Sequence, residues 1–252
     1  MKVSEFQSAF GLPGRVLGVL RSRDGVPSKG PEVFRGRCTL TSLHYAMEGH
    51  TVWLKESNSP CKGGLVGLGL RDGLPDIPGG FGFFISSGRG EGFPPGERLK
   101  SCPETGEQMI LSQPQGVMEG YEELRIKPYE DGDEADTVIL FCDADQLGAM
   151  IFLFNYSKSG TDYDTVIAPA AAGCASLFRI PFGELKRPEP RAVIGLTDIN
   201  ARIHFDSRWL SFTVSKREFQ RMLRDADDSF VKTQLWAPIA QRRERPEERK
   251  DN

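Results

Sequence analysis

"TVILFCDADQLGAMIFLFNYSKSG", residues 137–160, decides the fold class because it places a strand directly before a buried helix. Residues 137–143 are rich in β-branched and large apolar side chains, which is typical of a strong strand. The apolar run that follows predicts a buried helix, with a strand in its second half as the alternative. We therefore expect an α/β or α+β chain that has mixed sheets with flanking helices.

Further strands are predicted on both sides of this stretch. Apolar runs indicate strands at 16–21, 51–56, 79–88, 191–196 and 209–214, and a short strand within 164–178. Helices are expected at 37–49, where Leu40, Leu43 and Met47 share one face and Gly49 fits the stop position. The clearest local signal lies at 214–230, where Ser215 and Glu218 form a capping box. The Gly- and Pro-rich residues 86–110 predict a surface loop with a short helix.

The acidic stretch at 130–136 predicts a seam between two lobes, 1–130 and 131–236. Each lobe contains a strand, a cysteine at a helix start, and further strands and a helix in a similar order, so the lobes are expected to be pseudo-repeated. The alternative is that any alternating chain aligns this loosely. The end of the chain, "QRRERPEERKDN" (residues 241–252), is nearly all charge, so the tail over 237–252 is predicted to be disordered or a frayed helix extension.

The composition narrows the classes of function. The 252 residues carry a net charge of −3, and no basic stripe is interleaved with aromatic residues, so the sequence gives no reason to expect nucleic acid as a partner. It lacks an apolar run of the length that crosses a membrane. The first residues lack the apolar segment of a secretory signal, so we expect a cytoplasmic protein whose thiols stay reduced.

Five widely spaced cysteines, without a C-x-x-C pair, argue against a disulfide framework and against a zinc knuckle. Cys38, Cys61 and Cys174 all stand near glycines at expected helix starts. If they converge, three thiolates suit zinc or an iron–sulfur cluster with one other ligand. The alternative is three buried small apolar side chains, which is common for free cysteine.

The stretch "SPCKGGLVGLGL", residues 59–70, supports two further hypotheses. A helix that starts here would favour a thiolate at Cys61, or a small anionic ligand held by Lys62, Gly63 and Gly64. The glycine spacing matches neither a P-loop nor a dinucleotide fingerprint. Small residues that only allow close packing are the alternative. Arg21 follows the first strand and is a second candidate for the anion.

The remaining polar candidates carry weaker signals. His44 and His50 are six residues apart and do not share a helical face, although a pair of His44 with a cysteine stays open. Asp198 and Arg202 have the spacing of a surface ion pair. If the preceding strand is parallel in its sheet, Asp198 would lie where α/β ligands dock.

Four blocks of this sequence together resemble the ArCR family, a domain of unknown function (number 169) found in archaea and bacteria. They are "CTLTSLHYAMEGHTVWLKESNSPCKGGLVGLGL", "VIAPAAAGCASLF", "AVIGLTDINAR" and "LSFTV". The resemblance covers residues 6–236, which implies one ArCR-like domain over 1–236. It also implies that the family's motifs place a cysteine at the positions of Cys38, Cys61 and Cys174. The family carries no established activity, and Lys62 and the long 86–118 loop look peculiar to this chain.

The leading hypothesis is a cysteine-dependent site of Cys38, Cys61 and Cys174 that binds zinc or an iron–sulfur cluster and has a redox or accessory role. One alternative is a non-catalytic module for a small anion. The other is a thiol enzyme with Cys61 as the nucleophile. The sequence does not decide whether the protein is an enzyme, what its oligomeric state is, or which substrate it would take.

Overall fold

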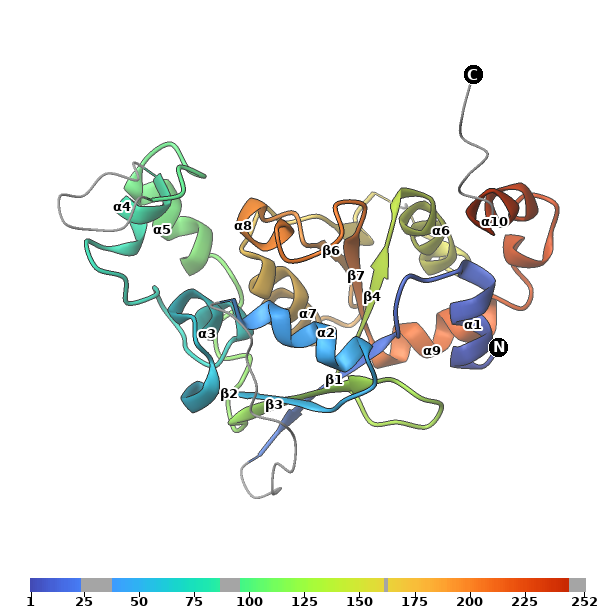
Figure 1. The fold of residues 1–252 in the computed structure, drawn as a ribbon, viewed down its shortest axis with the longest axis horizontal. Coiled ribbons are helices and arrows are strands. Elements are labelled where there is room, and N and C mark those ends of the chain that lie inside the picture. The colour runs from blue at the N-terminus through green and yellow to red at the C-terminus, as the bar shows by residue number, and fades with distance from the viewer. Residues whose placement is uncertain (24–37, 87–95, 161–162, 245–252) are drawn as a thin grey trace.

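A computed structural model describes residues 1–23, 38–86, 96–160 and 163–244. Its centre is one seven-stranded mixed sheet in the order β2-β3-β1-β4-β7-β6-β5 (Figure 1). Neighbouring strands are antiparallel except for the parallel pair β5 and β6. The strands are β1 (Leu17–Ser22), β2 (Val52–Lys55), β3 (Glu123–Pro128), β4 (Thr137–Cys142), β5 (Val166–Ile167), β6 (Ala192–Gly195) and β7 (Leu210–Ser215).

Strand β4 lies at the middle of the sheet and is buried along its whole length. Val138 and Leu140 belong to the core on one face, whereas Ile139 and Phe141 belong to the core on the other. Because a strand directs successive side chains to opposite faces, this continuous apolar run is what a strand covered by helices on both faces requires. The mixed α/β architecture predicted from this stretch is confirmed.

Three helices cover one side of the sheet, which we call the scaffold face: α1 (Val3–Phe10), α6 (Ala144–Asn155) and α9 (Lys216–Asp225). Figure 1 shows them on the opposite side of β4 and β7 from α2, α3 and α7. Their core is aromatic, with Phe219 edge-on to Phe6 at a ring-centroid distance of 5.5 Å. Half of the expected capping box is present: the Ser215 hydroxyl accepts a hydrogen bond from the Glu218 N–H, whereas the Glu218 carboxylate pairs with Arg221 and Lys158.

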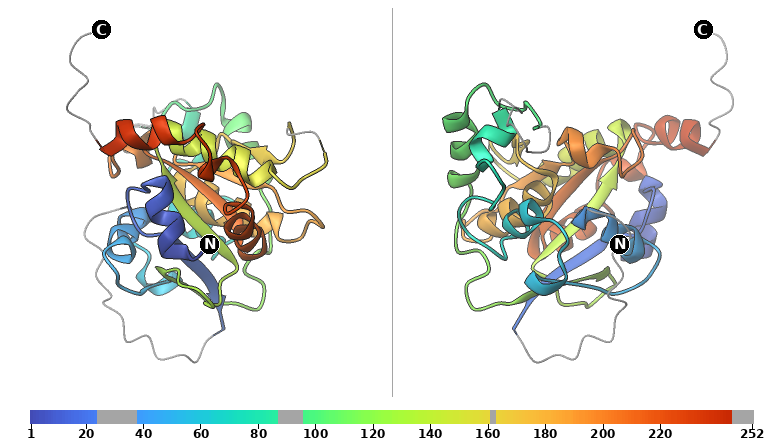
Figure 2. Two further views of the ribbon diagram at one scale, coloured as in Figure 1. Left: turned by 90° about the vertical axis from the view of Figure 1, so that its right-hand side faces the viewer. Right: turned by 60° about the vertical axis from the view of Figure 1, so that its left-hand side comes forward.

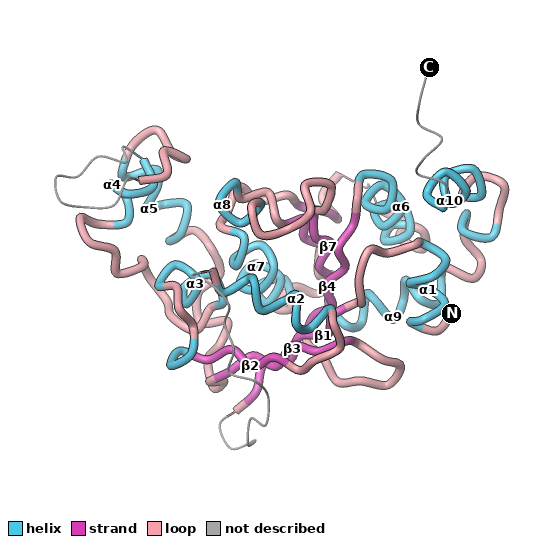
Figure 3. The backbone as a smooth tube through the Cα atoms, viewed as in Figure 1, coloured by secondary structure: helices cyan, strands magenta, loops and turns pink. Residues whose placement is uncertain are grey.

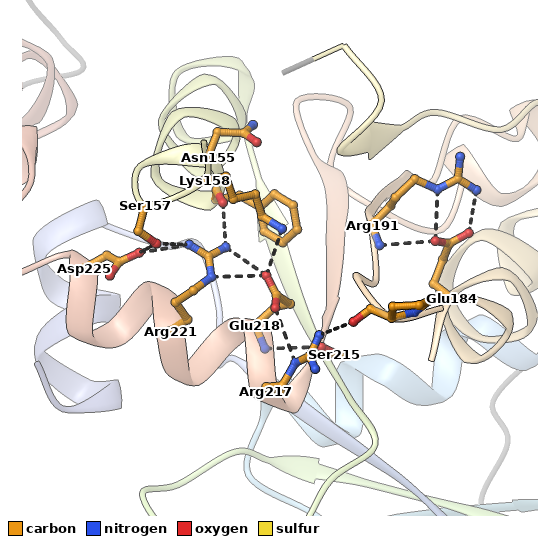
Figure 4. Close-up of polar contacts among 12 residues, drawn as sticks. Asn155, Ser157, Lys158, Glu184, Arg191, Ser215, Arg217, Glu218, Arg221 and Asp225 are labelled. Carbon is orange, nitrogen blue, oxygen red and sulfur yellow. Dashed lines mark hydrogen bonds and ion pairs between the residues drawn. The ribbon is translucent and has the colours of Figure 1, made fainter. Parts of the chain in front are cut away.

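Ion pairs fasten α9 to the end of α6 on the scaffold face (Figure 4). The Glu218 carboxylate accepts hydrogen bonds from Arg221 at 2.9 Å and pairs with Lys158 at 3.2 Å. Arg221 also donates to the backbone carbonyl of Phe154 and pairs with Asp225. These partly buried side chains satisfy one another, so the network is a structural fastening between two helices.

The other side, which we call the cysteine face, is built from short helices. They are η1 (Thr39–Thr41), α2 (Ser42–Met47), α3 (Lys62–Leu68), the π-helical η3 (Ala175–Arg179), α7 (Ile180–Glu184) and α8 (Ile199–Arg202). Figure 2 shows them gathered on one side of the sheet. Gly49 ends the α2 region with a φ of 110°, as its predicted stop position requires.

The helices α4 (Phe81–Ser86) and α5 (Pro103–Leu111) form a hairpin beside α3, at the edge of the molecule in Figure 3. The strand predicted at 79–88 is wrong, because residues 81–86 are helical. Phe81 and Ile85 lie four residues apart and share one buried face with Ile110 of α5 and Val66 of α3. A short aromatic run fits both periodicities, and only this tertiary packing selects the helix. The helix expected in the 86–110 region is α5.

Strands from both predicted lobes belong to a single sheet, because β1 pairs with β3 on one side and with β4 on the other. The pseudo-repeat is not confirmed, since its third strand in the first half is the helix α4. At the C-terminal end, α10 (Ala237–Glu244) forms the helix that was one alternative for the tail. Residues 245–252 of the predicted tail lie outside the described residues. Among the described residues, none of the helices has the length and apolar character needed to cross a membrane.

Candidate functional site

Cys38, Cys61 and Cys174 lie at the first turns of three short helices on the cysteine face. Cys38 precedes η1, Cys61 is the N-cap of α3, and Cys174 is the N-cap of η3. Burial raises the pKa of the Cys38 thiol, and so does the charge of Cys61. Burial also raises the pKa of Cys174 well above its usual range, with further contributions from the other two cysteines. The three thiols are therefore close enough to influence one another.

Two glycines of α3 allow this convergence. A Cβ atom at Gly67 would lie 2.6 Å from the Cβ of Cys174, so only glycine lets α3 approach the start of η3 this closely. A Cβ atom at Gly64 would lie 2.7 Å from the Thr39 hydroxyl, next to Cys38. Gly69 ends α3 in the left-handed conformation, with a φ of 83°. Most of the glycine pattern in residues 59–70 thus serves close packing and helix termination.

The three thiols differ in their surroundings. Cys174 is buried, whereas Cys38 and Cys61 are each half-buried. The Cys61 sulfur accepts a hydrogen bond from the Gly64 N–H at 3.2 Å, which is the capping interaction of α3. The Cys61 sulfur therefore combines an N–H donor with access to solvent.

Asp198 joins the cysteines through its own capping role. One of its carboxylate oxygens accepts the Gly173 N–H at 2.9 Å and the other accepts the Asn200 N–H at 3.1 Å. Its charge contributes to the raised pKa values of Cys38 and Cys174. Asp198 therefore anchors the turn before Cys174. Its carboxylate also adds an oxygen to the side chains that could ligate a metal.

The predicted surface ion pair between Asp198 and Arg202 is not formed among the described residues. The Arg202 guanidinium donates instead to the backbone carbonyls of Trp209 and Ser207. Asp198 follows β6, which pairs in parallel with β5 and antiparallel with β7.

Sequence reasoning missed Glu97. Its backbone N–H donates to the Phe84 carbonyl, which places Glu97 beside α4. Burial raises the pKa of the Glu97 carboxyl, and the charge of Asp198 raises it further. A single glutamate in a Gly- and Pro-rich segment has no motif around it. Only the fold of the α4–α5 hairpin could have revealed it.

The chemical nature of these side chains suits a soft metal, but their geometry in this structure does not. Three thiols with a carboxylate are ligands that zinc accepts, and three thiols with one other ligand can hold an iron–sulfur cluster. Yet among the described residues no group of three or more His, Cys, Asp or Glu side chains is arranged to hold a metal ion. Binding would therefore require the thiol side chains to turn toward a common centre.

The residues of the small-anion hypothesis are engaged elsewhere. Lys62 pairs with Asp76 at 2.8 Å, and both side chains are mostly exposed. Arg21 binds the Asp136 carboxylate with two nitrogens and also donates to the Val117 carbonyl. Lys62 and Arg21 share no partner among the described residues.

Gly63 and Gly64 complete that predicted set. The Gly64 N–H is already bonded to the Cys61 sulfur. A Cβ atom at Gly63 would meet the same sulfur at 3.8 Å, which is an ordinary contact. The Gly64 N–H is therefore engaged by the Cys61 thiol.

The other histidine and cysteine candidates have structural partners. The His44 ring lies 2.7 Å from the His204 carbonyl through Nε2 and stacks on Phe205 at 4.9 Å. Cys102 lies 3.1 Å from the Thr105 hydroxyl at the start of α5. Cys142 is buried in the core of the scaffold face. These groups lie outside the thiol site.

Comparison with known proteins places this fold in a family. A family model described as "Uncharacterised ArCR" (domain of unknown function 169) matches residues 5–225. The chain belongs to the ArCR family. No curated protein and no solved structure matches it. The match confirms the resemblance carried by the four sequence blocks. It includes the three cysteines, Glu97 and Asp198, whereas α10 lies beyond it.

Proposed function

We propose that this ArCR protein binds a soft metal ion or an iron–sulfur cluster through Cys38, Cys61 and Cys174, for a redox or accessory role. The supporting observation is that α3 packs through Gly64 and Gly67 against the chain beside Cys38 and against Cys174, while the charge of Asp198 reaches two of the thiols. If the cysteines were merely small core residues, nothing would favour this gathering. Cys142, which is buried among the apolar side chains of the scaffold core, is what such a residue looks like.

Electrostatics adds a second argument. Each thiolate or carboxylate in this cluster disfavours the next, and the charges that raise the pKa values of Cys38 and Cys174 come from cysteines and Asp198. A bound cation reverses that effect, because metal coordination deprotonates a thiol. When bound, zinc would supply a Lewis acid and a cluster would supply electron transfer. The residues of this chain would hold the group, and Asp198 would keep the turn before Cys174 in place.

The test is anaerobic purification of the full chain, followed by iron, sulfide and zinc analysis before and after reconstitution. We expect the wild type to retain one of these groups and the Cys61→Ser and Cys174→Ser variants to lose it. Cys102→Ser is the matched control, since Cys102 is half-buried like Cys61 but lies at the start of α5. A wild type that retains neither zinc nor iron after reconstitution contradicts the proposal.

A thiol enzyme that uses Cys61 is the second candidate. It is favoured by one observation, the N–H···S hydrogen bond from Gly64 to a half-exposed sulfur. Activated thiols are accessible and have such donors, whereas buried structural cysteines are inert. We therefore expect iodoacetamide to alkylate Cys61 faster than Cys102 at neutral pH, as read by peptide mass spectrometry. Equal rates at the two cysteines would remove this candidate.

A further inference from the structure

Arg179 is the largest fully buried side chain among the described residues, and it ends the π-helical η3. Each of its five N–H donors has an acceptor from another part of the chain. They are the carbonyls of Pro114, Val66 and Arg71, the Gln115 amide oxygen at 2.6 Å, and the Asp72 carboxylate. A guanidinium has five donors and no acceptor, so its hydrogen bonding is complete.

This saturation explains how a charged side chain is tolerated in the core. A buried charge without partners is strongly unfavourable, whereas one that is paired and fully hydrogen-bonded is not. Four of the five acceptors lie in two loops, 71–72 and 114–115, and the fifth, Val66, lies in α3. Arg179 therefore fastens η3 to α3 and to both loops at once. π-helical turns of the kind that carries it are rare and frequent at functional sites.

The connection to Val66 concerns the thiol site directly. The α3 helix begins after Cys61 and the η3 helix begins after Cys174, so the contact between these helices sets the relation between the two cysteines. Arg179 donates to the Val66 carbonyl at 2.7 Å. Gly67, the residue after Val66, packs against Cys174. The hydrogen bond and the glycine contact hold the same interface.

We infer that Arg179 is a positioning residue of the thiol site, which keeps Cys61 and Cys174 within reach of one another by clamping α3 to η3. The inference rests on the proposed function in one respect, namely that the cysteines act together. It does not depend on which group they bind. Lysine cannot replace this arginine, because an ammonium has three donors on a point charge and lacks the planar fork.

The experiment measures the proximity of the thiols without any metal. Phenylarsine oxide, a trivalent arsenical that bridges two thiols, is titrated into the reduced, chelator-treated full chain, and the remaining free thiols are counted. We expect the wild type to lose two thiols, with Cys174→Ala as the sulfur control. Arg179→Lys should bind the arsenical at least about tenfold more weakly, which is the scale of a small misplacement of one ligand.

Two further variants separate positioning from stability. Phe6→Leu weakens the scaffold core, far from α3 in the contact network, and should leave arsenical binding unchanged. Asp72→Ala removes a half-exposed acceptor of Arg179, should stay folded, and should give a smaller loss in the same direction. If Arg179→Lys does not fold, Asp72→Ala against Phe6→Leu decides the matter.

Each outcome has one meaning. Equal arsenical binding by the wild type and the Arg179 and Asp72 variants overturns the inference, and so does a wild type that never loses two thiols. A loss in Phe6→Leu as large as in Arg179→Lys also overturns it, because the effect would then be general instability. Arsenical binding that depends on Arg179 in a protein that retains neither zinc nor iron leaves the inference standing and refutes only the proposed metal function.

Discussion

The two faces of the sheet are built by different means. On the scaffold face α1, α6 and α9 have 8, 12 and 10 residues, and both α6 and α9 begin with a side-chain cap. On the cysteine face η3 continues directly into α7, but α2, α3 and α8 have only 6, 7 and 4 residues. Helices this short have almost no stability of their own, so tertiary contacts must hold them.

The difference assigns a task to each face. The longer helices of the scaffold face bury a shared aromatic core, and this tertiary packing lets the scaffold face stabilise the fold. Short helices add little stability, but each one starts a chain segment in a defined place, and Cys38, Cys61 and Cys174 all stand at such starts. On the cysteine face, the close contact at Gly67 and the hydrogen bond from Arg179 to Val66 both fix the distance between α3 and η3.

The largest expected effect is the loss of an aromatic side chain from the scaffold face. Phe219 is fully buried and packs edge-on against Phe6 and Tyr129. Phe219→Ala should lower the free energy of unfolding by about 3–5 kcal/mol, as measured by urea denaturation. Below the transition, alkylation of Cys61 should keep its wild-type rate. A changed rate would show that the two faces are not independent.

The reverse experiment adds a methyl group to the cysteine face, where the previous one removes a side chain from the scaffold face. At Gly67 it would lie 2.6 Å from the Cβ of Cys174, so Gly67→Ala should cost about 1–3 kcal/mol through overpacking. It should also change the alkylation rate of Cys61, because α3 must move. Gly148→Ala in α6 is the control, since its methyl would meet nothing within 4 Å and lies on the scaffold face. Equal behaviour of the two variants would contradict the role given to Gly67.

This contrast explains how much the sequence could predict. The strand β4, the helix α6 and the capped helix α9 follow from local patterns, and all three are confirmed. The strand predicted at 79–88 is wrong, because its aromatic run carries no decisive periodicity and packs as a helix on α5. Local rules work where local interactions determine the structure.

The site shows the same division. Glycine neighbours and expected helix starts single out Cys38, Cys61 and Cys174 among five cysteines, and in the structure their charges influence one another; that they form a metal site stays a prediction. Glu97 and Arg179 escaped, because neither lies in a motif and each acts through partners distant in the sequence. Arg21 was selected as an anion candidate, although its guanidinium is already paired with Asp136.

A helix cap gives a smaller effect that sharpens the comparison. The Ser215 hydroxyl accepts the Glu218 N–H at the start of α9, so Ser215→Ala should cost about 1 kcal/mol. The cap belongs to the scaffold face, and we expect arsenical binding to be unchanged. Asp198→Ala removes the corresponding cap of α8 and also frees the Gly173 N–H beside Cys174. It should change both stability and arsenical binding; if it changes stability alone, Asp198 is only a cap.

The stability contributed by the two faces should also be lost at opposite ends of the pH range. Burial disfavours the charged form of Glu218, but Arg221 and Lys158 outweigh it and lower the pKa of this carboxyl. A lowered folded-state pKa gives stability that is present above the unfolded value of about 4.3 and is lost as the pH falls. Glu218→Gln should therefore flatten the acid side of a plot of urea midpoint against pH.

Burial raises the pKa of Cys174, with added effects from Cys38, Cys61 and Asp198, so in the metal-free protein the sign is reversed. The stability from this thiol is complete below the unfolded value of about 8.5 and is lost as the pH rises above it, because only the unfolded chain then releases the proton. Cys174→Ala should flatten the alkaline side of the same plot and leave the acid side unchanged. An alkaline side that keeps its wild-type slope in Cys174→Ala would mean that this thiol is not held neutral by the cysteine face.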